Sequence, residues 1–175
     1  MRNTVILFIF FLTSCSDFLV LEPTTESTEL DFFTSESNAR LAVNAAYDPL
    51  GWGESSILGA NGHSYFFIIG DICSDDAEKG SSDSDQAGIA QLKDFTANPG
   101  TSNLSVLWSK HYIAIARANL VIKNLLESPI QQEVKDELEA EVRFVRAYAY
   151  FTLVRIFGGV PLFDSPISPD QINQK

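Results

Sequence analysis

The sequence is poor in the residues that carry most catalytic and metal chemistry. It has 175 residues but only 2 cysteines and 2 histidines, too few for a disulfide-based scaffold or a structural zinc site. Neither His63 nor His111 has a serine or cysteine beside it in a recognised nucleophile motif. Cys73 stands among aspartates, which should raise the pKa of its thiol. The sequence therefore predicts a protein that is not an enzyme and that uses neither a cofactor nor a metal.

Basic residues are scarce as well. The 12 lysines and arginines are outnumbered by 23 acidic residues, and the net charge is −11. Such a chain has no basic surface to hold a phosphate backbone, so nucleic acid is excluded as a partner. Hydrophobic residues nevertheless make up 45% of the chain and include 13 phenylalanines. This composition is too apolar for a disordered segment, and the length suits a single folded core.

The one unbroken apolar run near the start of the chain is short. Val5–Leu12 follows a positively charged start and covers about 12 Å at a helical rise of about 1.5 Å per residue, far less than the roughly 30 Å of a bilayer core. Such a run is typical of a secretory signal peptide. The next residues, Leu12-Thr13-Ser14-Cys15, resemble the bacterial lipobox, in which the cysteine is lipidated and becomes the first mature residue. We expect residues 1–14 to be removed and Cys15 to carry the lipid; the alternative is a secreted protein in which Cys15 merely lies near the cleavage point.

The rest of the chain has the periodicity of an all-α protein. Residues 15–31 are polar and read as an extended, lipidated stalk, and residues 32–175 form the helical domain. Ser35 is a predicted N-cap for a helix that reaches Leu50, and two longer helices are predicted from about 102 to 127 and from 133 to 157. Residues 53–100 show no sustained period, and 64–69 fit either a strand or a buried helical turn.

Two features of the helix predicted at 133–157 allow predictions about its packing and its ion pairs. Ala140, Phe144 and Ala147 have the small–large–small spacing of a tetratricopeptide repeat, although an ordinary helical hairpin would also fit. The arginines of this helix are expected to pair with nearby acids or with the acidic loop at 71–85; they are Arg143, Arg146 and Arg155. We expect that loop to lie in solvent; the alternative is that it holds a cation, although its acids fit a calcium-loop pattern poorly.

Several segments taken together resemble the N-terminal region of the SusD/RagB family of outer-membrane nutrient-binding lipoproteins. The resemblance is carried by Cys15–Leu19, Gly70–Asp76, Leu107-Trp108 with Tyr112, Arg117–Asn119 and, most specifically, Glu141–Leu162. It implies a tetratricopeptide-like helical scaffold that is anchored by lipid in the outer membrane and faces the exterior. Members of the family are several-fold longer, so the chain is expected to be a truncated N-terminal portion.

The resemblance also implies a function and its partners. The protein is expected to bind an oligosaccharide or peptide and to work with a SusC-like TonB-dependent transporter in nutrient uptake; the alternative is a helical adaptor that makes only protein–protein contacts. Because sugar rings stack on aromatic faces and bond to amides, the candidate ligand contacts are aromatic and amide residues outside the long helices, namely Trp52, Phe95 and Asn98. Trp108 and Tyr112 lie on a helix stripe and are predicted to belong to the core.

Overall fold

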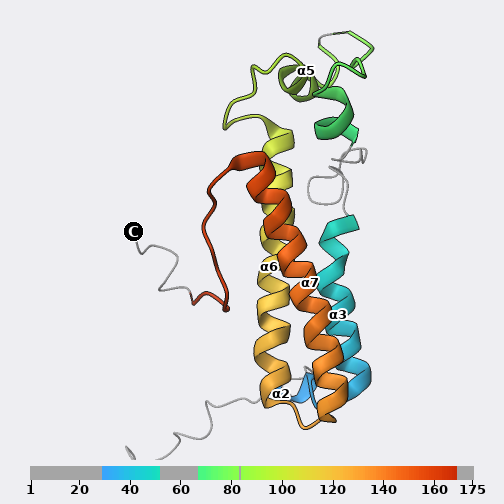
Figure 1. Ribbon diagram of the computed structural model, residues 1–175, viewed down its shortest axis with the longest axis vertical. Helices are drawn as coiled ribbons and strands as arrows, with labels where there is room; N and C mark the ends of the chain where they lie inside the picture. The colour runs from blue at the N-terminus through green and yellow to red at the C-terminus, as the bar shows by residue number, and fades with distance from the viewer. Residues whose placement is uncertain (1–28, 52–66, 83, 169–175) are drawn as a thin grey trace, which may run out of the picture.

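The structure, a computed structural model, describes residues 29–51, 67–82 and 84–168, and this part of the chain is helical without any strand. The elements in chain order are α2 (Glu29–Phe32), α3 (Glu36–Gly51), the π-helical turn η3 (Phe67–Ile72), α5 (Ala87–Lys93), α6 (Ser102–Glu127) and α7 (Gln132–Phe157). Figure 1 shows α3, α6 and α7 side by side along the long axis, with α5 near one end and α2 near the other. The predicted all-α class is confirmed.

The core lies between three long helices. α6 and α7 form an antiparallel hairpin, and α3 packs against both of them. Their apolar positions recur at helical spacing, so each helix turns one continuous stripe inward. The buried residues contributed by α6 and α7 include Ala114, Ile115, Ala118, Leu125, Leu138, Val142, Val145, Ala149 and Leu153. The predicted bounds of both long helices agree with the structure to within one residue.

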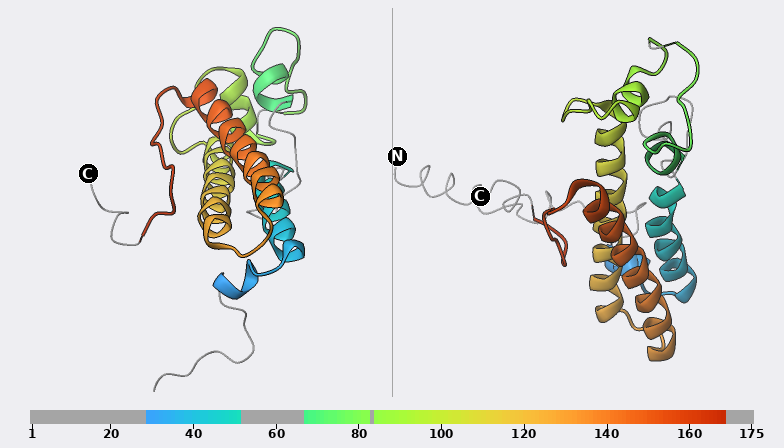
Figure 2. Two further views of the ribbon diagram at one scale, coloured as in Figure 1. Left: turned by 60° about the horizontal axis from the view of Figure 1, so that its bottom comes forward. Right: turned by 45° about the horizontal axis from the view of Figure 1, so that its top comes forward.

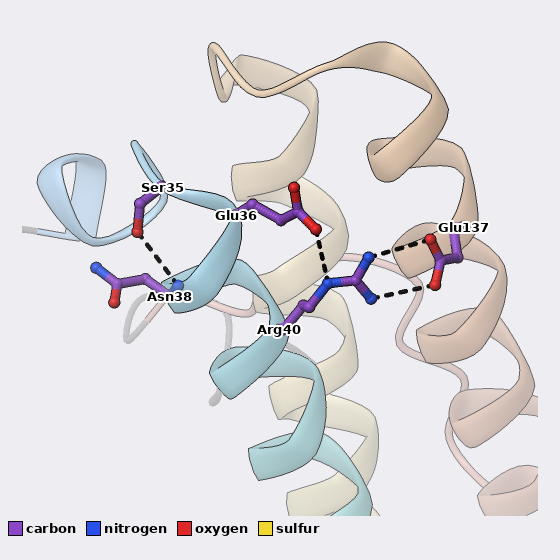
Figure 3. Close-up of polar contacts among 5 residues, drawn as sticks. All are labelled: Ser35, Glu36, Asn38, Arg40 and Glu137. Carbon is purple, nitrogen blue, oxygen red and sulfur yellow. Dashed lines mark hydrogen bonds and ion pairs between the residues drawn. The ribbon is translucent and has the colours of Figure 1, made fainter.

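The start of α3 is fixed by polar contacts (Figure 3). The Ser35 hydroxyl accepts a hydrogen bond from the Asn38 backbone N–H at 3.3 Å, which confirms Ser35 as the N-cap. One turn later, Arg40 donates from Nε to Glu36 at 2.9 Å and from its two terminal nitrogens to both oxygens of Glu137 on α7. The guanidinium of Arg40 accordingly lowers the pKa of Glu137. This fork ties α3 to α7 at the surface.

A second, smaller core covers the end of the bundle where α6 begins. Ile68 and Ile72 of η3 pack there against Ile89 and Leu92 of α5. Of the apolar segment 64–69, which could have been a strand, the structure describes residues 67–69, and these lie in the helical turn η3. Helix α5 was not predicted, because its seven residues are too few for a sustained period.

Some apolar residues of the long helices face outward. Leu126, in the last turn of α6, is 69% exposed. On α7, Ala140, Phe144 and Ala147 are all exposed, and so is Phe151. Within the described residues, the repeat-like spacing thus marks an outer face of the helix pair.

The described helices also bear on membrane insertion. None of the helices in the described ranges combines the length and apolarity that crossing a bilayer requires.

Candidate functional site

Phe95 is presented to solvent by a tight turn at the end of α5. The Phe95 N–H donates to the Leu92 carbonyl at 3.2 Å, and the Thr96 N–H donates to the Gln91 carbonyl at 2.9 Å. The backbone of Phe95 is left-handed, with φ 54°, and 81% of the residue is exposed. Both features are unfavourable for phenylalanine, because its Cβ crowds the left-handed backbone and its ring loses the benefit of burial. An exposed aromatic residue on a strained turn is a candidate for contact with a ligand.

Asn98 helps to fix the same loop. Its side-chain oxygen accepts a hydrogen bond from the Gly100 N–H at 2.9 Å, and its backbone N–H donates to the Thr101 hydroxyl at 3.1 Å. The Thr101 hydroxyl in turn donates to the side chain of Gln91 on α5 at 2.7 Å. These bonds hold the loop between α5 and α6 in one conformation, so Phe95 is displayed from a rigid base.

Two other predicted site residues cannot be placed in this way. Cys15, predicted to be lipidated, and Trp52, predicted to contact a ligand, both lie outside the described residues. The predicted signal peptide at 1–14 and most of the stalk at 15–31 lie outside them as well. These assignments stay predictions.

The acidic loop is held by a lysine of α5. Nζ of Lys93 donates to the carbonyls of Ser74 and Ala77 at 3.2 Å each and lies 3.4 Å from the carboxylate of Glu78. Over the described ranges of the chain, no ion pair joins an aspartate of this loop to an arginine of α7. The expected pairing of this loop with α7 is therefore wrong.

Cys73 lies at the edge of the smaller core. Burial of its thiol raises the pKa above its ordinary value, and the nearby charge of Lys93 opposes the shift. The direction agrees with the expectation, but the cause is burial rather than the neighbouring aspartates. A thiol in this state is a poor nucleophile.

Residues 158–168, which follow α7, are held against the helix hairpin by side chains from the segments that carry the family resemblance. The side-chain amide of Asn119 donates to the carbonyls of Phe163 and Ser165 at 3.0 and 3.2 Å. Arg146 donates to the Asn119 side-chain oxygen at 2.7 Å and to the Asp164 carbonyl at 2.9 Å. Residues 158–168 consequently run back along the hairpin (Figures 1 and 2).

Two tyrosines complete this latch, by which we mean the contacts that hold residues 161–165. The Tyr112 hydroxyl donates to the Pro161 carbonyl at 2.7 Å, and the Tyr150 hydroxyl accepts from the Phe163 N–H at 2.6 Å. Burial raises the pKa of both hydroxyls. The latch gives the most specific sequence motif a structural role.

Removing Asn119 should weaken the latch strongly. Its side chain is buried and makes three hydrogen bonds, each contributing about 1 kcal/mol, so Asn119→Ala should lower the free energy of unfolding by about 2–3 kcal/mol. Urea unfolding followed by circular dichroism measures this loss. Asn44→Ala, at an exposed site on α3, is the matched control and should change stability by less than about 0.5 kcal/mol. Equal effects of the two changes would contradict the latch.

The arginines of α7 have three different partners. Arg143 bonds to Glu139 one turn earlier at 2.7 Å, as expected. Arg146 serves the latch instead of an acidic side chain, and Arg155 lies over the ring of Phe151 at 5.3 Å from its centroid. The expectation of acidic partners is thus correct for Arg143 and wrong for the other two within the described residues.

A cavity beside the first third of α6 contains charged groups that the sequence patterns did not predict. It lies between the ends of α3 and η3 on one side and the hairpin on the other, and its volume is about 190 Å³. Lys110 and His111 line it and are only 5% and 3% exposed. A signal for them existed, because Lys110 and Ala114 continue the buried stripe of Leu107 at spacings of three and four residues.

Burial shifts the titration of both groups. It lowers the pKa of Lys110 to about 8. It also lowers the pKa of His111, assisted by the charge of Lys110 and opposed by a hydrogen bond between His111 Nδ1 and the Leu107 carbonyl at 2.8 Å. His111 is therefore neutral at pH 7, whereas most of Lys110 is charged. Phe95 is not among the residues that line the cavity, so the two candidate sites are separate.

Comparison with protein families gives a match over most of the described chain. The model of SusD-like proteins described as "Starch-binding associating with outer membrane" matches residues 60–173. Two SusD-like proteins of Formosa agariphila are similar in sequence, with 29% identity over 94% of this chain and 30% identity over 87% of it. The chain spans only 31% and 28% of the lengths of these relatives.

Solved structures show the same helical arrangement. The surface glycan-binding protein A of Bacteroides fluxus matches with a TM-score of 0.67 and 28% identity, over 76% of this chain and 28% of its own. A laminarin-binding SusD-like protein matches with a TM-score of 0.66 and 31% identity, over 80% of this chain and 29% of its own. The tetratricopeptide-like scaffold implied by the sequence resemblance is confirmed.

Proposed function

The chain belongs to the SusD-like family, and from this we propose that it is part of a nutrient-binding lipoprotein of the outer membrane. The proposed ligand is a glycan, with a peptide as the alternative ligand class. In this proposal Cys15 carries the lipid, the protein faces the exterior, and it delivers its ligand to a SusC-like TonB-dependent transporter. The family's description as starch-binding and associating with the outer membrane supports the membrane location and the ligand class.

The observation that carries the proposal is the exposed ring of Phe95 on its rigid turn. Two structurally similar proteins are named for binding glycans, one of them for laminarin. A pyranose ring has an apolar face of C–H groups, which can stack on an exposed aromatic ring held in place before binding. Asn98 supplies an amide in the same loop, and its oxygen accepts a bond from the Gly100 N–H. Phe95 is therefore the proposed stacking platform, with Asn98 at its rim.

Phe95→Ala should weaken glycan binding without harming the fold. The ring is exposed, and loss of one stacking contact of about 1 kcal/mol corresponds to about a fivefold loss of affinity. NMR titration of the chain with laminarin oligosaccharides, which detects millimolar binding, measures the change.

The matched control for this experiment is another exposed phenylalanine. Phe144→Ala removes a ring that is 61% exposed on α7, away from the Phe95 turn, and should leave the affinity unchanged. A loss of affinity that is the same in both variants would show that the Phe95 turn has no specific role. Unchanged affinity in Phe95→Ala would remove this residue from the site.

A further inference from the structure

The outer side of α7 carries a continuous row of apolar residues, which we call the outer stripe. Its members recur at alternating spacings of four and three residues and are Ala140, Phe144, Ala147, Phe151 and Val154. All of them are exposed, and the three larger side chains, taken in chain order, are 61%, 58% and 50% exposed. Single exposed apolar residues are common on proteins, but a contiguous row of them marks a surface that contacts a partner.

The spacing of the outer stripe is that of a coiled-coil contact. Alternating steps of three and four residues give an average period of 3.5, which keeps every member facing one partner helix. The residues that α7 buries in the core, such as Val142 and Ala149, lie on roughly the opposite side of the helix. The next positions of the repeat are Glu137, which is bonded to Arg40, and Gly158, the C-cap of α7. The outer stripe is therefore suited to one further helix of about four turns.

A second copy of α7 that runs antiparallel matches the outer stripe in side-chain size. With a twofold axis beside Tyr148, Phe144 lies opposite Val154 of the partner subunit, and Ala147 lies opposite Phe151 of the partner subunit. Each level of the helix pair then combines one phenylalanine ring with one smaller side chain. A parallel pair would place ring against ring and alanine against alanine, which alternates overfilled levels with empty ones and packs poorly.

The charges beside the outer stripe favour the same arrangement. Glu141 and Arg155 each directly follow a member of the outer stripe in sequence and lie on the same side of it. In the antiparallel pair, Glu141 lies opposite Arg155 of the partner subunit, and the twofold axis generates this contact twice. Within the described part of the chain neither residue forms an ion pair, and the Arg155 guanidinium lies over the ring of Phe151. Charge complementarity of this kind sets the orientation and register of paired helices.

The area of the outer stripe indicates how strong the contact is. A fully buried aromatic side chain covers about 150–250 Å², so Phe144 and Phe151 each have roughly 120 Å² left to bury. The four rings of a symmetric pair account for roughly 500 Å², and the other members with their flanking residues bring the total to about 1,000 Å², the lower limit for a specific interface. We expect a reversible dimer with a micromolar dissociation constant.

We propose that the outer stripe of α7 is the contact surface for a second copy of this chain, in a twofold-symmetric antiparallel helix pair. Sequence spacing, side-chain size and charge each support this occupant. The interface uses no residue of the Phe95 turn and goes beyond the proposed function.

Sedimentation of the full chain from low to high micromolar concentration tests the dimer. Phe144→Asp places a charge in the apolar contact twice and should weaken association at least tenfold, without loss of helicity by circular dichroism, because the ring is exposed in the single chain. Leu126→Asp, at a residue that is 69% exposed on α6, is the matched control and should associate like the unaltered chain.

The control also separates the outer stripe from other apolar segments. Association through the run Val5–Leu12 would be equally strong in both variants. Unchanged association in Phe144→Asp would therefore overturn the proposal. A chain that stays monomeric at every concentration would also overturn it, and the outer stripe would then serve a different polypeptide.

A charge exchange tests the antiparallel register. Arg155→Glu places like charges opposite each other at Glu141 of the partner subunit and should weaken the dimer several-fold. Adding Glu141→Arg to this variant restores opposite charges at both contacts and should recover most of the affinity. In a parallel pair these residues do not face each other, so an absence of recovery would overturn the antiparallel arrangement.

Cross-linking locates the twofold axis. In a chain with Cys15→Ala and Cys73→Ala, a short bismaleimide should join two copies of Tyr148→Cys, because this position lies beside the axis. The matched control is Glu141→Cys, whose two copies lie about 21 Å apart along the helix pair at a rise of about 1.5 Å per residue, too far for the reagent. Equal cross-linking at the two positions would indicate a parallel pair or random collision and would overturn the proposed geometry.

Discussion

Trp108→Ala is expected to lower the free energy of unfolding by about 3 kcal/mol, a large share of the stability of a typical domain. The indole lies against two rings, with centroid distances of 4.9 Å to Tyr112 and 5.0 Å to Phe157. It thereby joins the second turn of α6 to the last turn of α7, beside the latch. The side chain is only half-buried, which places the expected loss at the lower end of the range for tryptophan truncation.

Urea unfolding of the variant, with circular dichroism as the probe, measures this effect. Leu126→Ala is the matched control, because Leu126 lies on the same helix but is 69% exposed, and its loss should stay below about 0.5 kcal/mol. A loss below about 1 kcal/mol for Trp108→Ala would mean that the ring contacts contribute little, and Trp108 would then become a candidate surface for a ligand.

The helical core could be predicted because its information is local. The apolar spacing of α6 and α7 is repeated over seven turns, and Ser35 and Gly158 mark helix ends through their own backbone and side-chain chemistry. The Gly158 N–H bonds to the Val154 carbonyl, and its φ of 76° suits a residue without a side chain. Short elements such as α5 carry too few residues for the same signal.

The candidate sites depend on contacts between distant segments, and these were harder to predict. The sequence identified Phe95 and Asn98 as loop residues, but the network from Gln91 through Thr101 that holds the loop became visible only in the structure. Likewise, the periodicity of α6 could have placed Lys110 on a buried face, but it gave no reason for a cavity there. That cavity exists because residues of α3, η3 and α7 meet at this level of α6.

The residues of the family motif also have partners that the sequence did not predict. The segment that contains Arg146 and Tyr150 was the most specific part of the family resemblance, and charge alone suggested acidic partners for its arginines. The structure instead directs Arg146 to a side-chain oxygen and a backbone carbonyl. An extended segment that pairs with no helix or strand has backbone carbonyls without hydrogen-bond donors from the backbone. Polar side chains of neighbouring helices can donate to these carbonyls instead.

Cys15→Ala is expected to abolish lipidation and, with it, anchoring by lipid. The thiol of Cys15 is the only group at the predicted lipobox that can accept a diacylglycerol chain, and alanine cannot replace it. Each buried CH₂ contributes about 0.8 kcal/mol, so two or three acyl chains hold a protein almost irreversibly, whereas their loss leaves no comparable attachment. Labelling of cells with radioactive palmitate, followed by separation of membrane and soluble fractions, measures the outcome.

The other cysteine provides the control that makes this experiment specific. Cys73→Ala removes a half-buried thiol of the smaller core and should leave both palmitate labelling and sedimentation unchanged. The Cys15 variant should lose the label and should remain uncleaved or be found in the soluble fraction. If it still carries palmitate and still sediments with membranes, lipidation occurs elsewhere or the protein is held by other contacts, and Cys15 would then be an ordinary residue near the signal-peptide cleavage point.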